Sequence, residues 1–148
     1  MTIRRNVWVI HGPNLNLLGE REIEIYGDKT LEEINKEIIA EGKKLGVIVT
    51  CKQSNHEGQL IDWLHEARNL ADFVVINPGG YTHTSVALAD ALAQIPAVEV
   101  HISNLHSREG FRRRSFIAPR AIGRIEGLGW SGYLLAVRYA AAYLKGEL

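Results

Sequence analysis

With 148 residues, of which 46% are hydrophobic and 23% charged, the chain has the composition of an ordinary globular protein and not of a disordered or fibrous one. Lys and Arg total 17, as do Asp and Glu, so no general electric field favours nucleic acid or an anionic membrane. The single cysteine, Cys51, excludes an intrachain disulfide and is typical of a reducing compartment.

The apolar run nearest the N-terminus, residues 7–10, ends before Pro13. It is too short for a signal peptide or a membrane-spanning helix. No repeat, low-complexity tract or linker interrupts the chain. We therefore expect a cytoplasmic protein that forms one domain over residues 1–148.

Apolar strands alternate with helical patterns along the chain. Strands are predicted at residues 7–10, 47–51, 73–76, 97–102 and, more weakly, 121–127. Helices are predicted behind the capping boxes Thr30–Glu33 and Ser54–Glu57, behind residues 82–85, and over residues 130–144. This alternation predicts an α/β protein: a flavodoxin-like three-layer sandwich whose five-stranded parallel sheet has the order 2-1-3-4-5, with helices on both faces.

The chain is organised around residues 73–92, a buried strand that breaks at Asn77-Pro78-Gly79-Gly80 and continues into a helix. In the predicted order this strand lies beside the first one, so its loop faces the Gly12-Pro13-Asn14 loop. Open α/β sheets bind ligands there, beyond the carboxyl ends of the strands. Asn14, Asn77 and His83 are therefore candidate binding residues, although Asn in turns and exposed His are common without a ligand.

Two further segments bring ionisable groups to the same edge. The connector of residues 15–27 carries Arg21 and Tyr26, and an arginine beside a phenol favours the phenolate, which can act as a base. Glu99 and His101 alternate along the fourth strand, so the carboxylate could orient the imidazole as a general acid. Each pair also has an ordinary structural interpretation, as an anchoring aromatic beside a solvated Arg or as a His on a wet strand end.

Signatures of other chemistries are missing from the sequence. It has no Gly-x-Gly-x-x-Gly or Walker A segment for nucleotide phosphates, and its histidines and Cys51 lack metal-ligand spacing. The lysines lie outside the loop motifs, which leaves no obvious Schiff-base nucleophile. We expect neither a cofactor nor a metal.

Four blocks of sequence, which together span nearly the whole chain, resemble type II 3-dehydroquinate dehydratases. They are residues 12–19 with Arg21 and Tyr26-Gly27, residues 53–58, residues 77–85, and residues 99–104 with 108–115. The resemblance implies a cofactor-free lyase that converts 3-dehydroquinate to 3-dehydroshikimate by anti elimination of water through an enolate. It also implies a place in the shikimate pathway of chorismate and aromatic amino acid biosynthesis, or in quinate catabolism.

The same resemblance implies a role for each candidate residue. Tyr26 removes the proton beside the ketone, Arg21 stabilises the phenolate, and Asn14 holds a water that stabilises the enolate. His101, oriented by Glu99, protonates the departing hydroxyl. The remaining residues bind substrate, its hydroxyls at Asn77, His83 and Arg112 and its carboxylate at the backbone of Ile102 and Ser103.

Assembly is also implied by the resemblance, which indicates a homododecamer built as a tetramer of trimers. Asp90 lies seven residues after His83, so the two are expected to share one face of a helix. At that separation both cannot contact one small ligand. An acid at this distance on a helix is ordinarily a solvated charge, but the resemblance implies that Asp90 reaches the site of a neighbouring subunit.

Two other classes of protein are compatible with the same sequence pattern. A flavodoxin-like flavin-binding or response domain needs a phosphate loop after the first strand or an acidic cluster, and residues 11–14 supply neither convincingly. An interaction module leaves the converging Asn, His, Arg and Tyr unexplained. Bound flavin is yellow, so a spectrum separates the first alternative from a cofactor-free enzyme.

Overall fold

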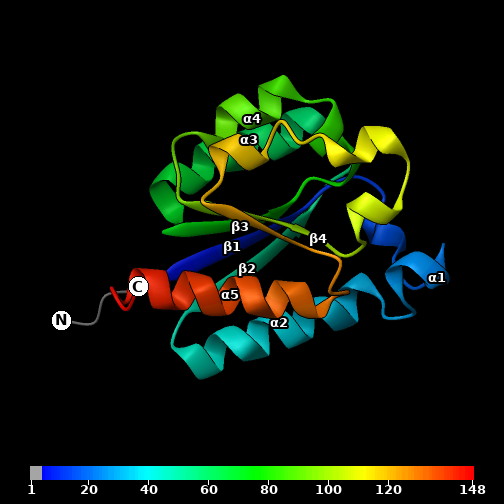
Figure 1. Cartoon of the computed structure of the whole chain (residues 1–148). Coiled ribbons are helices and arrows are strands. Elements are labelled where there is room, and N and C mark those ends of the chain that lie inside the picture. The colour runs from blue at the N-terminus through cyan, green and yellow to red at the C-terminus, as the bar shows by residue number, and fades with distance from the viewer. Residues whose placement is uncertain (1–4) are drawn as a thin grey trace.

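The computed structural model describes residues 5–148, so the first four residues of the expected domain lie outside the described part. One parallel sheet has the order β2-β1-β3-β4-β5. Its strands are β1 (Asn6–His11), β2 (Ile48–Gln53), β3 (Phe73–Asn77), β4 (Ala97–His101) and β5 (Gly123–Glu126). Helices α2 (Leu31–Leu45) and α5 (Ser131–Leu144) cover one face, and α3 (Glu57–Leu70) and α4 (Val86–Leu92) the other (Figure 1). The predicted sandwich and strand order are confirmed.

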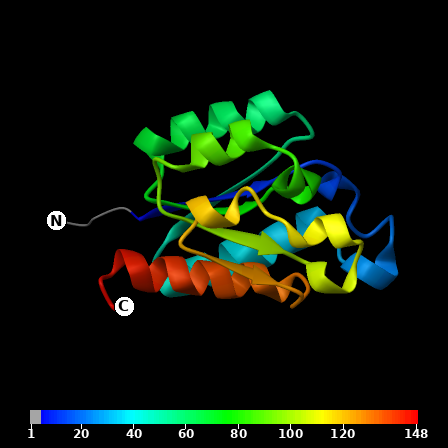
Figure 2. The ribbon, with the colours of Figure 1, turned by 45° about the horizontal axis from the view of Figure 1, so that its top comes forward.

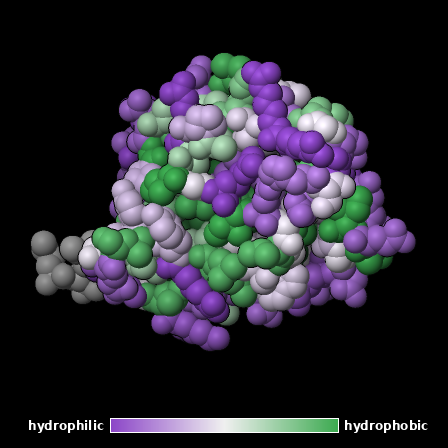
Figure 3. Space-filling view, in the orientation of Figure 1, coloured by the Kyte–Doolittle hydropathy of each residue, from purple (hydrophilic) through white to green (hydrophobic). Residues whose placement is uncertain are grey.

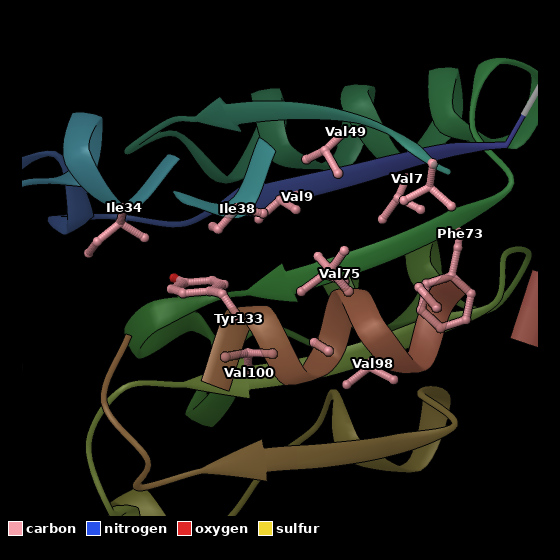
Figure 4. Close-up of a cluster of buried hydrophobic side chains, with 14 of the residues drawn as sticks. Val7, Val9, Ile34, Ile38, Val49, Phe73, Val75, Val98, Val100 and Tyr133 are labelled. Atoms are coloured by element: carbon pink, nitrogen blue, oxygen red, sulfur yellow. The ribbon is translucent and has the colours of Figure 1, made fainter. Parts of the chain in front are cut away.

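The central strands are buried on both faces because their side chains alternate between two apolar layers. One layer joins Val9 and Val75 to α2 and α5, as Figure 4 shows. The other joins Ile10 and Ile76 to α3 and α4. The β1–β3 pair is therefore a rigid support for the loops at its carboxyl end. Within residues 5–148, no helix has the length and apolar composition needed to cross a membrane.

Local capping explains where α2 begins and ends. The Thr30 hydroxyl accepts a hydrogen bond from the Glu33 N–H, as the capping box predicts, and Gly46 closes the helix with a φ of 77°. The second predicted capping box is wrong. His56 is the N-cap residue of α3, and the Ser54 hydroxyl instead accepts from the His56 N–H in the preceding turn.

The helix after β3 begins behind residues 82–85, as predicted: α4 starts after Ser85, whose hydroxyl accepts from the Leu88 N–H. Residues Gly79–His83, however, form a separate short 3₁₀ helix. The premise that His83 and Asp90 share one helix face is therefore wrong. The break turns His83 toward the edge of the sheet, where the loops gather.

Short helical turns occupy the long connections at this edge. The connector after β1 contains a 3₁₀ turn (Leu15–Leu17) and α1 (Ile23–Tyr26). The chain after β4 contains three more 3₁₀ turns, at Leu105–Ser107, Gly110–Arg113 and Ala118–Arg120. Figure 2 shows α1 (blue) and the segment after β4 (yellow) at the same end of the molecule. These two connections enclose the space above the strand ends.

Candidate active site

A cavity lies at the carboxyl edge of the sheet, where the loops after β1, β3 and β4 meet α1. Nine of the eleven predicted site residues line it: Asn14, Arg21, Tyr26, Asn77, His83, His101, Ile102, Ser103 and Arg112. Glu99 lies behind His101, and Asp90 lies on α4 away from the lining. The topology thus brings together residues from four separate parts of the chain.

The loops after β1 and β3 are in close backbone contact at the centre of this edge. The Gly12 N–H donates to the Asn77 carbonyl over 2.7 Å. A Cβ at Gly12 would come within 2.6 Å of the Pro78 carbonyl, so only glycine permits this approach. Asn14 adopts a left-handed φ of 69°, which Asn tolerates better than most residues, and its N–H donates to Asn55 Oδ1. This geometry fixes where Asn14 and Asn77 enter the cavity.

Tyr26 ends α1, and two arginines flank it. The Arg108 guanidinium donates to the Tyr26 hydroxyl over 2.6 Å. Arg21, the predicted partner, has its guanidinium carbon 5.8 Å from the centre of the Tyr26 ring, and it pairs with Glu22. A cationic donor at the phenol oxygen is a strong, charge-assisted hydrogen-bond partner for that oxygen. Nothing in the spacing of the arginines in residues 108–114 shows which of them reaches Tyr26.

Glu99 and His101 form the predicted contact beneath the cavity floor. His101 Nε2 donates to the Glu99 carboxylate over 2.5 Å, and the hydroxyls of Thr82 and Ser115 also donate to it, over 2.5 and 2.9 Å. Burial acts to raise the pKa of Glu99, but these hydrogen bonds together with the His101 charge hold it below its ordinary value. The ionised carboxylate therefore fixes the His101 ring, which leaves Nδ1 as the nitrogen available to a ligand.

His83 is oriented by the segment that follows β4. Its Nδ1–H donates to the Arg114 carbonyl over 2.7 Å, which leaves Nε2 as a hydrogen-bond acceptor. Partial burial lowers the pKa of His83, and the nearby charges of His101 and Arg112 add to this effect. His83 is therefore neutral at pH 7 and can accept a hydrogen bond from a hydroxyl. Arg112 is held by Glu109 over 2.5 Å.

Three polar residues without a predicted role, Thr82, Ser115 and Tyr133, hold the predicted site residues in place. Thr82 and Ser115 orient Glu99, as described above, and the hydroxyl of Tyr133 accepts from Asn77 Nδ2 over 2.9 Å. Thr82 and Ser115 lie within motif blocks but carry no distinguishing spacing. Tyr133 follows the apolar pattern of α5, which indicates only a core residue.

Asp90 does not join the cavity of its own chain. Its carboxylate is 65% exposed and lies 3.5 Å from the Arg120 guanidinium. Within residues 5–148, no group of three or more His, Cys, Asp or Glu side chains is placed to hold a metal ion.

Comparisons with known proteins agree on one family. Residues 5–141 match the family described as "Dehydroquinase class II". The "3-dehydroquinate dehydratase" of Pelotomaculum thermopropionicum is 57% identical over 138 residues, covering 92% of this chain and 96% of that protein. The protein of the same name from Ruegeria pomeroyi is 53% identical over 144 residues, covering 96% and 97%.

Solved structures extend the agreement to the fold. The crystal structure of type II dehydroquinase from Butyrivibrio crossotus matches with a TM-score of 0.90 at 46% identity, covering 93% of this chain and 97% of that one. The type II dehydroquinase from Propionibacterium acnes matches with a TM-score of 0.91 at 40% identity, covering 96% and 99%.

Proposed function

Because the chain belongs to the class II dehydroquinase family and is an enzyme of that type, we propose that it converts 3-dehydroquinate to 3-dehydroshikimate. We place this reaction in the shikimate pathway of chorismate and aromatic amino acid biosynthesis, or in quinate catabolism. One observation carries the proposal: a phenol held by a guanidinium and an imidazole held by a carboxylate line the same cavity. Elimination of water needs a base and an acid, and the cavity offers one of each.

The reaction begins at Tyr26. Its phenolate takes the proton from the carbon beside the ketone, and the electron pair moves to the ketone oxygen to give an enolate. Arg108 and Arg21 stabilise the phenolate, and Asn14 holds a water that donates to the enolate oxygen. This step converts a weakly acidic C–H bond into a stabilised anion.

The second step returns the electron pair and expels the hydroxyl group. The Glu99 carboxylate accepts from His101 Nε2 and orients the ring, and the Nδ1–H of protonated His101 gives its proton to the departing oxygen. The carbon–oxygen bond breaks, a carbon–carbon double bond forms, and water leaves. We place the base and the acid on opposite sides of the substrate, as anti elimination requires.

The remaining lining residues hold the substrate during both steps. Asn77 and His83 Nε2 hydrogen-bond to hydroxyl groups, and Arg112 adds a charged donor. The backbone N–H groups at Ile102 and Ser103 receive the carboxylate. Fixing the ring in this way aligns the C–H bond with Tyr26.

The test is conversion of 3-dehydroquinate by the purified chain, followed through the enone absorbance of the product. We expect turnover by the wild-type chain and nearly none by Tyr26→Phe, because loss of a general base costs about 10²–10⁴ in rate. Circular dichroism checks that the variant folds. No product from the folded wild-type chain refutes the proposed function, whereas a variant that keeps more than about a hundredth of kcat refutes only Tyr26 as the base.

We propose that the active form is the homododecamer, a tetramer of trimers, with Asp90 completing a neighbouring cavity. The exposure of Asp90 outside its own cavity supports this arrangement. So do the hydrophobic residues that Figure 3 shows in the middle of the face over β5 and α5. Ile122, Leu128 and Leu135 are exposed there, beside the edge strand β5, and apolar surface next to a sheet edge is typical of an interface.

Two variants separate this role of Asp90 from its contact with Arg120. We expect Asp90→Ala to lower kcat/KM clearly more than Arg120→Ala, because only the first removes a carboxylate from a neighbouring site. Sedimentation combined with an assay at the same concentration gives the active species. A fully active monomer would contradict the proposed assembly.

A further inference from the structure

A row of four polar side chains runs beneath the cavity, from α2 through β1 and α5 to β3. Asn35 Oδ1 lies 2.8 Å from His11 Nε2, and His11 Nδ1 lies 3.0 Å from the Tyr133 hydroxyl oxygen. Asn77 Nδ2 lies 2.9 Å from the same oxygen. His11 and Tyr133 are fully buried, and the proposed chemistry uses neither. Figure 4 shows Tyr133 among apolar side chains near the carboxyl end of β3.

One backbone group sets the direction of every hydrogen bond in this row. The Gly79 N–H can only donate, and it lies 3.1 Å from Asn77 Oδ1, so the Asn77 amide nitrogen faces Tyr133. That nitrogen also only donates, so the Tyr133 oxygen accepts and its own hydrogen goes to His11 Nδ1. His11 then carries its hydrogen on Nε2 and donates to Asn35 Oδ1.

Only a neutral His11 completes this arrangement. A hydrogen on Nδ1 would face the Tyr133 oxygen and leave the phenol hydrogen without its acceptor. Burial lowers the pKa of His11 to about 4, against a smaller opposing effect of the Asn35 hydrogen bond. Burial also raises the pKa of Tyr133, so the phenol keeps its hydrogen at neutral pH. Both groups therefore hold the protonation state that the row requires.

We infer that His11 and Tyr133 are positioning residues, which hold the Asn77 amide so that its second Nδ2 hydrogen donates to a substrate hydroxyl. The amide has two hydrogens, Tyr133 takes one, and Asn77 lines the cavity. The inference rests on the proposed function, which assigns Asn77 to a hydroxyl of 3-dehydroquinate. A hydroxyl held equally in ground and transition states affects KM more than kcat.

A double-mutant cycle between Tyr133→Phe and Asn77→Ala tests the inference. Tyr133→Phe keeps the ring but removes the acceptor for the amide, so we expect KM for 3-dehydroquinate to rise about fivefold to tenfold, the effect of one lost hydrogen bond. We expect kcat to stay within about twofold. In the Asn77→Ala background the same change should alter KM by less than about twofold, because no amide remains to be positioned.

Tyr139→Phe is the matched control, because it removes a hydroxyl from the same helix at a ring that packs against Phe73. Its KM should equal that of the wild-type chain. If Tyr133→Phe fails to fold, Asn35→Ala replaces it in the cycle, since it removes the acceptor at the outer end of the row and should raise KM in the same direction.

Two results would overturn the inference. One is an unchanged KM in the folded Tyr133→Phe enzyme, which would leave the row a purely structural element. The other is additive effects on KM in the cycle. Failure of the proposed function is distinguishable from both, because in that case the wild-type chain itself would not convert 3-dehydroquinate.

Discussion

Tyr26 has two cationic neighbours with different geometries, and they are expected to contribute unequally. Arg108 donates directly to the phenol oxygen, whereas Arg21 faces the ring and is paired with Glu22. A hydrogen bond to a charged group contributes about 1.5–3 kcal/mol, so Arg108→Met should lower kcat roughly tenfold to a hundredfold. Steady-state assays give kcat, with the exposed Arg113→Met as control. Wild-type kcat in Arg108→Met would leave Arg21 as the cation that matters.

Cys51 has the environment of an unreactive thiol. Burial raises its pKa to about 12, so little thiolate exists at pH 8. The higher intrinsic nucleophilicity of a thiolate with a high pKa offsets part of this loss, and we expect the native thiol to react at least about tenfold more slowly than an unfolded one. Absorbance with a disulfide reagent, with and without urea, measures both rates. Equal rates would show that the Cys51 thiol is accessible and as reactive in the folded chain as in the unfolded one.

At the scale of elements, contact between the β1 and β3 loops depends on Gly12. A methyl group there would press on the rigid backbone of Pro78, and overpacking of this kind typically costs about 1–3 kcal/mol. Gly12→Ala should therefore lower the free energy of unfolding in urea by this amount. Gly58→Ala, in α3 with open space around its Cα, is the control and should be neutral or slightly stabilising. Equal free energies of unfolding for the two variants would show that the β1 and β3 loops can move apart to accommodate the methyl group without loss of stability.

For the whole molecule, the buried row predicts how stability depends on pH. The folded pKa of His11, about 4, lies below its ordinary value of 6.5, so between these values the unfolded chain binds a proton that the folded chain does not. The contribution of neutral His11 to the free energy of unfolding is therefore complete above pH 6.5. It is lost as the pH falls toward 4, by up to about 3 kcal/mol. The lowered pKa of Glu99 adds a further loss at still lower pH.

Urea unfolding at pH 7.5, 6 and 5 checks this dependence. We expect the free energy of unfolding to fall across the series, and His11→Gln to be less stable at pH 7.5 but to show a shallower fall. His65→Gln, at an exposed position on α3, should keep the wild-type slope. An unchanged slope in His11→Gln would assign the acid sensitivity to other groups.

The pattern of apolar runs was enough to predict the architecture and the location of the site. Apolar runs such as residues 73–76 can be buried on both faces only in a covered parallel sheet, and the carboxyl ends of parallel strands meet at one edge. Residues placed at or just beyond those ends, among them Asn14, Asn77 and His101, were therefore predicted to converge, and they line one cavity. The start of α2 was equally predictable because the contact between Thr30 and Glu33 is local.

Contacts between side chains far apart in the sequence could not be predicted from it. His11 reaches Tyr133 across 122 positions and Arg108 reaches Tyr26 across 82, and no local pattern encodes such pairs. The Ser54–Glu57 capping box was wrong for a related reason. A Ser hydroxyl can accept from a backbone N–H either in a turn or at a helix start, and in the folded chain Ser54 accepts from His56 in the turn before α3. Periodicity specifies which face of an element is buried, whereas a hydrogen bond depends on atoms that only the packing of distant elements brings within 3 Å.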